Sequence, residues 1–186
     1  MATTKQIAVA NSTSRSGSAI GHKAITPKMV RKYVDLKNGK RTMTILDFGA
    51  GKTADHARKF VEDGYNCLAH EFGDNIDPRY HCELSMLNTY DVVYASNVLN
   101  VQQSYSMVVE MLDQVKHVMK PTSVFIANFP LKPRKMDITA EDMGEWLRLA
   151  FKHVVVVGGN NQAPIFLAFG CYHQHHLGEI AWQKKW

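Results

Sequence analysis

The sequence predicts a single α/β domain with a mostly parallel sheet of seven strands that ends in an antiparallel hairpin. Three observations lead to this fold class. Strand-like apolar runs alternate with amphipathic helical segments, the first run enters the glycine turn Gly49-Ala50-Gly51, and Gly158-Gly159-Asn160-Asn161 joins two final strand-like runs. Alternating strands and helices require a parallel sheet that is covered on both faces. A closing hairpin then reverses one strand near the edge.

The length and composition allow one domain with two terminal extensions. A chain of 186 residues, of which 45% are hydrophobic, can bury a full core but is too short for two ordinary domains. We expect a flexible N-terminal arm over residues 1–25, the domain over residues 26–172 and a tail over residues 173–186. The arm is rich in Ser, Thr, Ala and Gly and shows no apolar period.

The first half of the chain supplies two helices and four strands. Thr26 followed by Pro27 is typical of a helix start, because threonine caps the helix and proline fits its first turn. A turn-rich segment from Gly73 to Pro78 separates the second strand from a short third one. The elements expected here are helices over residues 26–38 and 54–62, and strands over residues 43–48, 65–71, 80–84 and 91–96.

The second half supplies two helices and three strands. Apolar residues recur at helical spacing between Ser104 and Pro121, and Thr139 with Asp142 has the form of a capping box. Short apolar runs bounded by turn residues predict the strands. The elements expected here are helices over residues 105–119 and 139–150, and strands over residues 123–128, 154–157 and 165–169.

A nucleoside site is predicted at the ends of the first two strands. In an open parallel sheet, ligands bind beyond the carboxyl ends of the strands. The glycines at 49 and 51 permit a tight turn and let a ligand approach the backbone, and Asp47 can accept a hydrogen bond from a cationic amine. Glu71 follows Gly51 by twenty residues and ends the second strand, where a carboxylate can bind both hydroxyls of a ribose.

Two other nucleotide sites compete for this pattern. A phosphate-binding loop needs a glycine at the position of Leu46, and Asp47 would repel a phosphate, so this site is excluded. A dinucleotide site agrees with the spacing of Gly49, Gly51 and Ala54. It leaves Asp47 unexplained, however, and a dehydrogenase also needs a substrate domain for which the chain has little room.

From about Thr44 to Phe169 the sequence resembles the class I S-adenosylmethionine-dependent methyltransferase family, which has a Rossmann-like fold. The segment from Ile45 to Gly51 is similar to the family's first motif, although Thr53 replaces its third glycine. The resemblance also covers Glu71, the segments 82–84, 91–99 and 118–121, and the final hairpin. It implies an enzyme that binds S-adenosylmethionine through Asp47, Phe48, Gly49, Ala50, Gly51, Glu71, Phe72, Glu83, Leu84, Ser96 and Asn97.

The methyl acceptor is expected to be a nucleic acid. The formal net charge is +5, and a basic N-terminal region from Lys23 to Arg41 precedes the first strand; such a region favours an anionic partner or is simply solvated. The segment Ser96 to Val101 resembles methyltransferases linked to DNA phosphorothioation. The proline-proline-aromatic motif of amino-methylating DNA enzymes is absent there, and none of the three cysteines follows a proline.

Alternative functions are a small-molecule or protein methyltransferase, or a non-catalytic cofactor-binding module that acts through a partner. The sequence identifies neither a catalytic residue nor an oligomeric state. No apolar run approaches the roughly 20 residues that cross a bilayer, so we expect a cytoplasmic protein. His173, His175 and His176 lack neighbouring Cys or carboxylate pairs at ligand spacing, and no metal site is expected.

Overall fold

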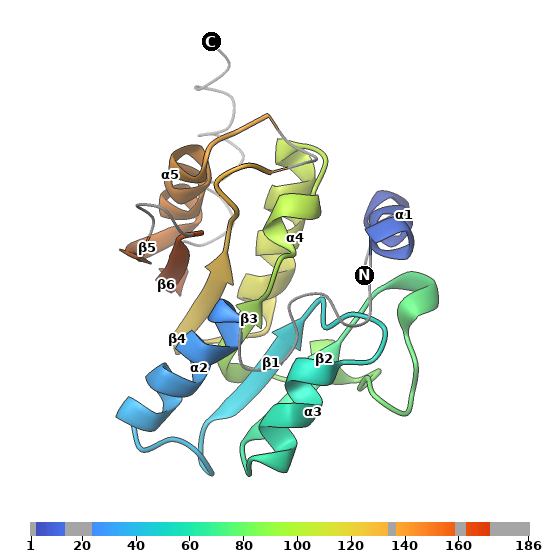
Figure 1. Cartoon of the computed structure of the whole chain (residues 1–186), viewed down its shortest axis with the longest axis vertical. Coiled ribbons are helices and arrows are strands. Elements are labelled where there is room, and N and C mark those ends of the chain that lie inside the picture. The colour runs from blue at the N-terminus through green and yellow to red at the C-terminus, as the bar shows by residue number, and fades with distance from the viewer. Residues whose placement is uncertain (1–2, 14–23, 134–136, 159–162, 172–186) are drawn as a thin grey trace.

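The structure is a computed structural model that describes residues 3–13, 24–133, 137–158 and 163–171. Its centre is a six-stranded sheet in the order β2-β1-β3-β4-β6-β5 (Figure 1). The strands are β1 (Thr44–Phe48), β2 (Asn66–His70), β3 (Tyr90–Ala95), β4 (Met119–Asn128), β5 (Phe151–Val157) and β6 (Ile165–Cys171). β2, β1, β3 and β4 pair in parallel, and β6 is antiparallel to both of its neighbours.

Helices cover both faces of the sheet, as the alternating pattern requires. α2 (Ile25–Leu36) and α3 (Asp55–Glu62) pack on one face. α4 (Tyr105–His117) and α5 (Ala140–Ala150) pack on the other. Side chains of β1 alternate between the two cores, so that Leu46 faces α4 while Ile45 faces α2 and α3.

Side chains cap two of the helices, and one of these caps was predicted. The Ser104 side chain accepts a hydrogen bond from the backbone N–H of Met107 at the start of α4. Thr139 and Asp142 form a reciprocal capping box at the start of α5. α2 begins at Ile25, just before the predicted Thr26-Pro27 start, and its Thr26 side chain bonds to Asn128 instead of capping the helix.

The predicted third strand, over residues 80–84, is wrong for this structure, which leaves six strands in place of seven among the described residues. These residues form turns, because the backbone N–H groups of Tyr80 and His81 both donate to the carbonyl of Asp77. Only one ladder-like bond joins the segment to β2, from Cys82 N to Ala69 O at 3.0 Å. In the described residues, β2 is therefore an edge strand of a six-stranded sheet.

The N-terminal arm contains a helix that the sequence pattern did not indicate. α1 (Thr4–Thr13) lies beside α4 and the 3-10 turn η2 (Gly73–Asn75) (Figure 1). The predicted domain limits at residues 25 and 172 stay predictions, and the histidines at 173, 175 and 176 lie outside the described residues. In the described part of the chain, no helix is both long and apolar enough to span a membrane.

Candidate functional site

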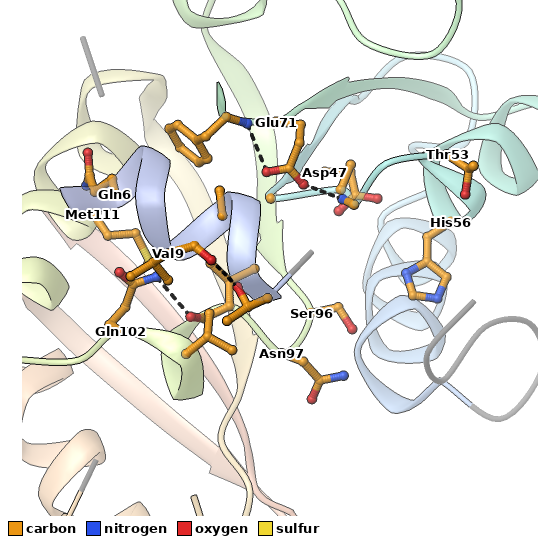
Figure 2. A pocket seen from close by; sticks show the side chains of 18 of the residues that line it. Gln6, Val9, Asp47, Thr53, His56, Glu71, Ser96, Asn97, Gln102 and Met111 are labelled. Atoms are coloured by element: carbon orange, nitrogen blue, oxygen red, sulfur yellow. Dashed lines mark hydrogen bonds between the residues drawn. The ribbon is translucent and has the colours of Figure 1, made fainter. Parts of the chain in front are cut away.

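A pocket lies at the carboxyl ends of β1, β2 and β3, at the edge where the sequence predicts a ligand. Three turns form it: Gly49 to Gly51 after β1, Glu71 and Phe72 after β2, and Ser96 to Val98 after β3. Figure 2 shows how side chains from these turns and from α1 surround the same space. The pocket therefore lies at the sheet edge where the strand ends predict a ligand site.

The glycine loop after β1 needs its glycines for two physical reasons. Gly49 and Gly51 have φ angles of 74° and 76°, in the left-handed region that strongly favours glycine. A Cβ atom on Gly49 would also lie 2.7 Å from Cγ2 of Val98. The backbone N–H groups of Gly49 and Ala50 both donate to the carbonyl of His70, which ties the loop to the end of β2.

Asp47 places a buried carboxyl group beneath this loop. Asp47 is 1% exposed, and its Oδ2 has no hydrogen-bond partner among the described residues. Burial raises the pKa of Asp47 to about 7; the neighbouring Tyr94 hydroxyl opposes this rise, and the Glu71 carboxylate adds to it. An unpartnered oxygen in a buried carboxyl group that lines a pocket can accept a hydrogen bond from a cationic ligand.

Glu71 is a second buried acid of the pocket, and it is 5% exposed. Its Oε2 accepts a 2.6 Å hydrogen bond from the backbone N–H of Gly51, and its Oε1 accepts one of 2.8 Å from Phe72. Each carboxylate oxygen has two lone pairs, so Glu71 keeps acceptor capacity for a ligand hydroxyl. The side chain thus supports the glycine loop and lines the pocket at once.

The turn after β3 is fixed by an amide pair that the sequence analysis missed. Asn97 has a φ angle of 60°, and its backbone N–H donates to Oδ1 of Asn128 at 2.8 Å. Nδ2 of Asn128 donates to Oδ1 of Asn97 at 2.7 Å, and Thr26 Oγ1 donates to Oδ1 of Asn128. The available signal for Asn128 was its position at the carboxyl end of the strand predicted over residues 123–128.

α1 supplies a wall of the pocket that sequence reasoning also missed. Gln6, Val9, Ala10 and Thr13 line the pocket. Polar bonds hold the helix, including a reciprocal pair between the Asn11 side chain and Asp74 with distances of 2.8 and 3.0 Å. No apolar period marks this segment, so only the tertiary contacts reveal its place.

Thr53, Asp55 and His56 form another part of the pocket lining. Thr53, which stands where the family's third glycine is expected, donates through Oγ1 to Asp55 Oδ2 at 2.6 Å. The ring of His81 accepts from the backbone N–H of Asp77 and bonds through Nε2 to the carbonyl of Gly51. The turns that replace the predicted third strand are thereby joined to the glycine loop.

The structure gathers most of the predicted binding residues and leaves three outside. Phe48 is buried in the core, and Glu83 and Leu84 do not line the pocket; Leu84 is 62% exposed. Glu83 and Leu84 lie outside the pocket because residues 80–84 form turns and not the predicted third strand. They therefore do not stand at the end of a strand beside the pocket. The predicted residues that line the pocket are Asp47, Gly49, Ala50, Gly51, Glu71, Phe72, Ser96 and Asn97.

The described pocket lining is acidic. It contains Asp47, Asp55 and Glu71, and neither Lys nor Arg is among the described residues that form it. In the described part of the chain, no group of three His, Cys, Asp or Glu side chains is placed to hold a metal ion. This lining suits an uncharged sugar and a cationic amine better than a phosphate.

Comparison of sequences finds neither a matching family model nor a matching curated protein. Comparison of structures finds many similar folds. A 1,6-didemethyltoxoflavin N1-methyltransferase from Burkholderia thailandensis, crystallised with its acceptor and S-adenosylhomocysteine, has a TM-score of 0.60 at 16% identity over 92% of each chain. A methyltransferase from Aquifex aeolicus has a TM-score of 0.57 at 14% identity, covering 87% of this chain and 96% of its own.

A third similar structure is magnesium protoporphyrin IX methyltransferase from Synechocystis PCC 6803 with bound S-adenosylmethionine. Its TM-score is 0.54 at 13% identity, and 77% of each chain is covered. Identities this low establish architecture and leave substrates open. The strand order, the reversed β6 and these similarities together give the chain the fold of the class I S-adenosylmethionine-dependent methyltransferases.

Proposed function

We propose that this protein is an S-adenosylmethionine-dependent methyltransferase. The observation that carries the proposal is the unpartnered Oδ2 of Asp47, which is buried under the glycine loop and lines the pocket. A cationic amine at this oxygen would satisfy it and stabilise its ionised form. The amino-acid end of S-adenosylmethionine carries such an amine, whereas a nicotinamide dinucleotide presents phosphates to the same loop.

The other lining residues fit the remaining parts of this cofactor. Glu71 would accept hydrogen bonds from the ribose hydroxyls, and Gly49, Ala50 and Gly51 would pass beneath the nucleoside. Phe72, Ser96 and Asn97 would complete the contacts from the ends of β2 and β3. The cofactor, when bound, supplies an electrophilic methyl group, so the protein's task is to align an acceptor and exclude water.

Known structures with this fold support the choice of cofactor. The Burkholderia enzyme was crystallised with S-adenosylhomocysteine and the Synechocystis enzyme with S-adenosylmethionine. A glycopeptide N-methyltransferase with a TM-score of 0.53 at 12% identity was crystallised with sinefungin. The acceptors that these names give differ from one another, so they do not indicate the acceptor of this chain.

For the acceptor we propose a nucleic acid. The net charge of +5 favours binding of a polyanion. Part of this positive charge lies on α2, whose residues are not in the acidic pocket lining. Thr26 in the first turn of α2 bonds to Asn128, which pairs with the pocket residue Asn97, and Lys28 and Lys32 are exposed farther along the same helix. Arg31 belongs to the fold instead, because it pairs with Asp63 at 2.6 Å and stacks on Phe60.

Isothermal titration calorimetry with S-adenosylhomocysteine and NAD tests the cofactor assignment. We expect S-adenosylhomocysteine to bind, and Asp47→Ala and Glu71→Ala each to weaken binding by about 1.5–3 kcal/mol, the range for hydrogen bonds to charged groups. Glu83→Gln is the matched control, because this acid lies outside the pocket and its loss should leave affinity unchanged. NAD binding that is tighter than S-adenosylhomocysteine binding would overturn the proposal.

A further inference from the structure

We propose that the Asn97 side chain binds the carboxylate of the cofactor's amino-acid end, and that Asn128 and Thr26 hold it in position for this contact. This inference rests on the proposed function and deepens it. It assigns a ligand group to Asn97 and gives a positioning role to Asn128, which is 4% exposed and does not itself line the pocket.

The orientation of the Asn97 and Asn128 side-chain amides follows from the backbone N–H of Asn97, which can donate a hydrogen bond but cannot accept one. The backbone N–H of Asn97 can only donate, so the Asn128 atom at 2.8 Å from it must be Oδ1. The other terminal atom of Asn128 is therefore Nδ2, and the Asn97 atom that it contacts at 2.7 Å must be an acceptor, Oδ1. The remaining terminal atom of Asn97 is then Nδ2, an N–H donor.

Three segments of the chain converge to hold this donor. Asn97 belongs to the turn after β3, Asn128 ends β4, and Thr26 lies in the first turn of α2, where its hydroxyl donates to Oδ1 of Asn128 at 2.9 Å. Asn97 itself has a φ angle of 60°, and asparagine tolerates this left-handed conformation better than most residues. So many constraints on one exposed side chain indicate preorganisation of its free group.

The free donor belongs to a residue at the rim of the pocket. Asn97 lines it and is exposed, and no hydrogen bond of its Nδ2 is found among the described residues. Figure 2 shows Asn97 next to Ser96 at the edge of the pocket. Three other neutral side chains of the lining already donate elsewhere: Thr13 to Val9, Thr53 to Asp55 and Gln102 to Val98.

The charges of the pocket indicate what this donor binds. The amino-acid end of the cofactor carries an ammonium and a carboxylate, and Asp47 is placed to take the ammonium. The carboxylate then needs N–H or O–H donors, since the described lining contains neither Lys nor Arg. The Nδ2 group of Asn97 is such a donor, and it adds no net charge beside the acids of the site.

Two ligands and two variants test this contact. S-adenosylhomocysteine carries the amino-acid end, whereas 5′-methylthioadenosine has the same nucleoside and thioether without it. Asn97→Asp keeps the Oδ1 that Asn128 contacts and replaces the free N–H group with a negatively charged oxygen. We expect calorimetry to show a loss of roughly 10- to 150-fold in S-adenosylhomocysteine affinity, with 5′-methylthioadenosine affinity changed less than twofold.

Asn128→Asp tests the positioning role, because it removes the donor to Asn97 Oδ1 and puts a carboxylate in its place. Weaker S-adenosylhomocysteine binding with unchanged 5′-methylthioadenosine binding is expected again. Gln103→Glu is the control, since it adds the same charge to an exposed residue nearby that does not line the pocket; it should change neither affinity. Thermal melting shows that each variant is folded.

The outcomes separate the inference from the proposed function. If Asn97→Asp changes both affinities equally, or changes neither, the carboxylate contact is wrong while the cofactor assignment stands. If the wild-type protein binds neither ligand, the proposed function is wrong, and so is the contact between Asn97 and the carboxylate. A selective loss for S-adenosylhomocysteine in both asparagine variants supports the full proposal.

Discussion

The backbone N–H of Gly51 donates a 2.6 Å hydrogen bond to Oε2 of Glu71, which joins the loop after β1 to the end of β2. The same carboxylate also accepts from the N–H of Phe72. The residue that we propose to bind a ribose therefore also holds the glycine loop in place. Binding and loop stability are coupled through this one side chain.

Replacing Glu71 should show how much its hydrogen bonds to the backbone contribute to stability. Glu71→Ala leaves the Gly51 N–H without its partner, and we expect the free energy of unfolding to fall by about 1–3 kcal/mol. Glu71→Gln keeps a carbonyl oxygen for one of the two backbone donors and should lose less. Urea denaturation monitored by circular dichroism measures both values, and equal losses would contradict the role of this contact.

Asp47→Asn should stabilise the unliganded protein at neutral and higher pH. Because burial raises the pKa of Asp47 to about 7 from 3.8, the folded state holds a proton that the unfolded state has released. This contribution to stability is present below pH 4 and is lost as the pH rises to about 7. The asparagine variant has no such loss.

Urea denaturation between pH 4 and pH 8 measures this difference. The stability of Asp47→Asn relative to the unchanged protein should grow across the interval and level off above pH 7, by up to a few kcal/mol. Subtracting the two curves removes the titration of all other groups. A difference that is independent of pH would show that Asp47 ionises in the folded state as it does in the unfolded chain.

Gly73→Ala should release α1 from the pocket. An added Cβ would lie 2.5 Å from Asn11 Oδ1 and 2.8 Å from Ile7 Cγ2, and the φ angle of 61° disfavours alanine as well. We expect faster hydrogen exchange at residues 4–13 while β1 and β3 stay protected. Gly64→Ala is the control, because its φ angle is also positive but its nearest contact is the end of the Lys40 side chain at 3.7 Å.

Replacing Lys28 and Lys32 with Gln should weaken nucleic-acid binding. For each phosphate that the variant no longer neutralises, the slope of log affinity against log salt should become shallower by about 0.7 to 0.9. Arg31→Gln should instead lower stability, because this side chain pairs with Asp63 and covers Phe60. Fluorescence anisotropy with labelled DNA and RNA at several salt concentrations measures the slope, and binding that is independent of salt would exclude the nucleic-acid acceptor.

The sequence predicted the parts of the fold that depend on local pattern. The runs that became β1 and β3 are buried and apolar, and Gly49 and Gly51 mark a turn that only glycine makes easily. The third strand failed because the turn at Asp77 continues through His81, whose ring bonds to Gly51 thirty residues away. No local pattern contains that contact.

The site shows the same division between local and distant causes. Asp47 and Glu71 could be proposed from local pattern, because Asp47 stands two residues before the glycine turn and Glu71 follows Gly51 by twenty residues. Asn128 was missed, since its role depends on a partner thirty-one residues earlier at the end of the neighbouring strand. α1 was missed because polar bonds to distant residues hold it, and such bonds leave no apolar period in the sequence.

The contacts of α1 also set the order in which the pocket is assembled. Its side chains bond to Asp74, Gln114 and, through the preceding Thr3, Glu110, at separations of 63, 108 and 107 residues. A ten-residue helix is marginal in water by itself, so α1 has no docking surface until α4, which follows it in the chain, has been synthesised and folded. This wall of the pocket is therefore synthesised before the elements on which it docks, and it forms after them.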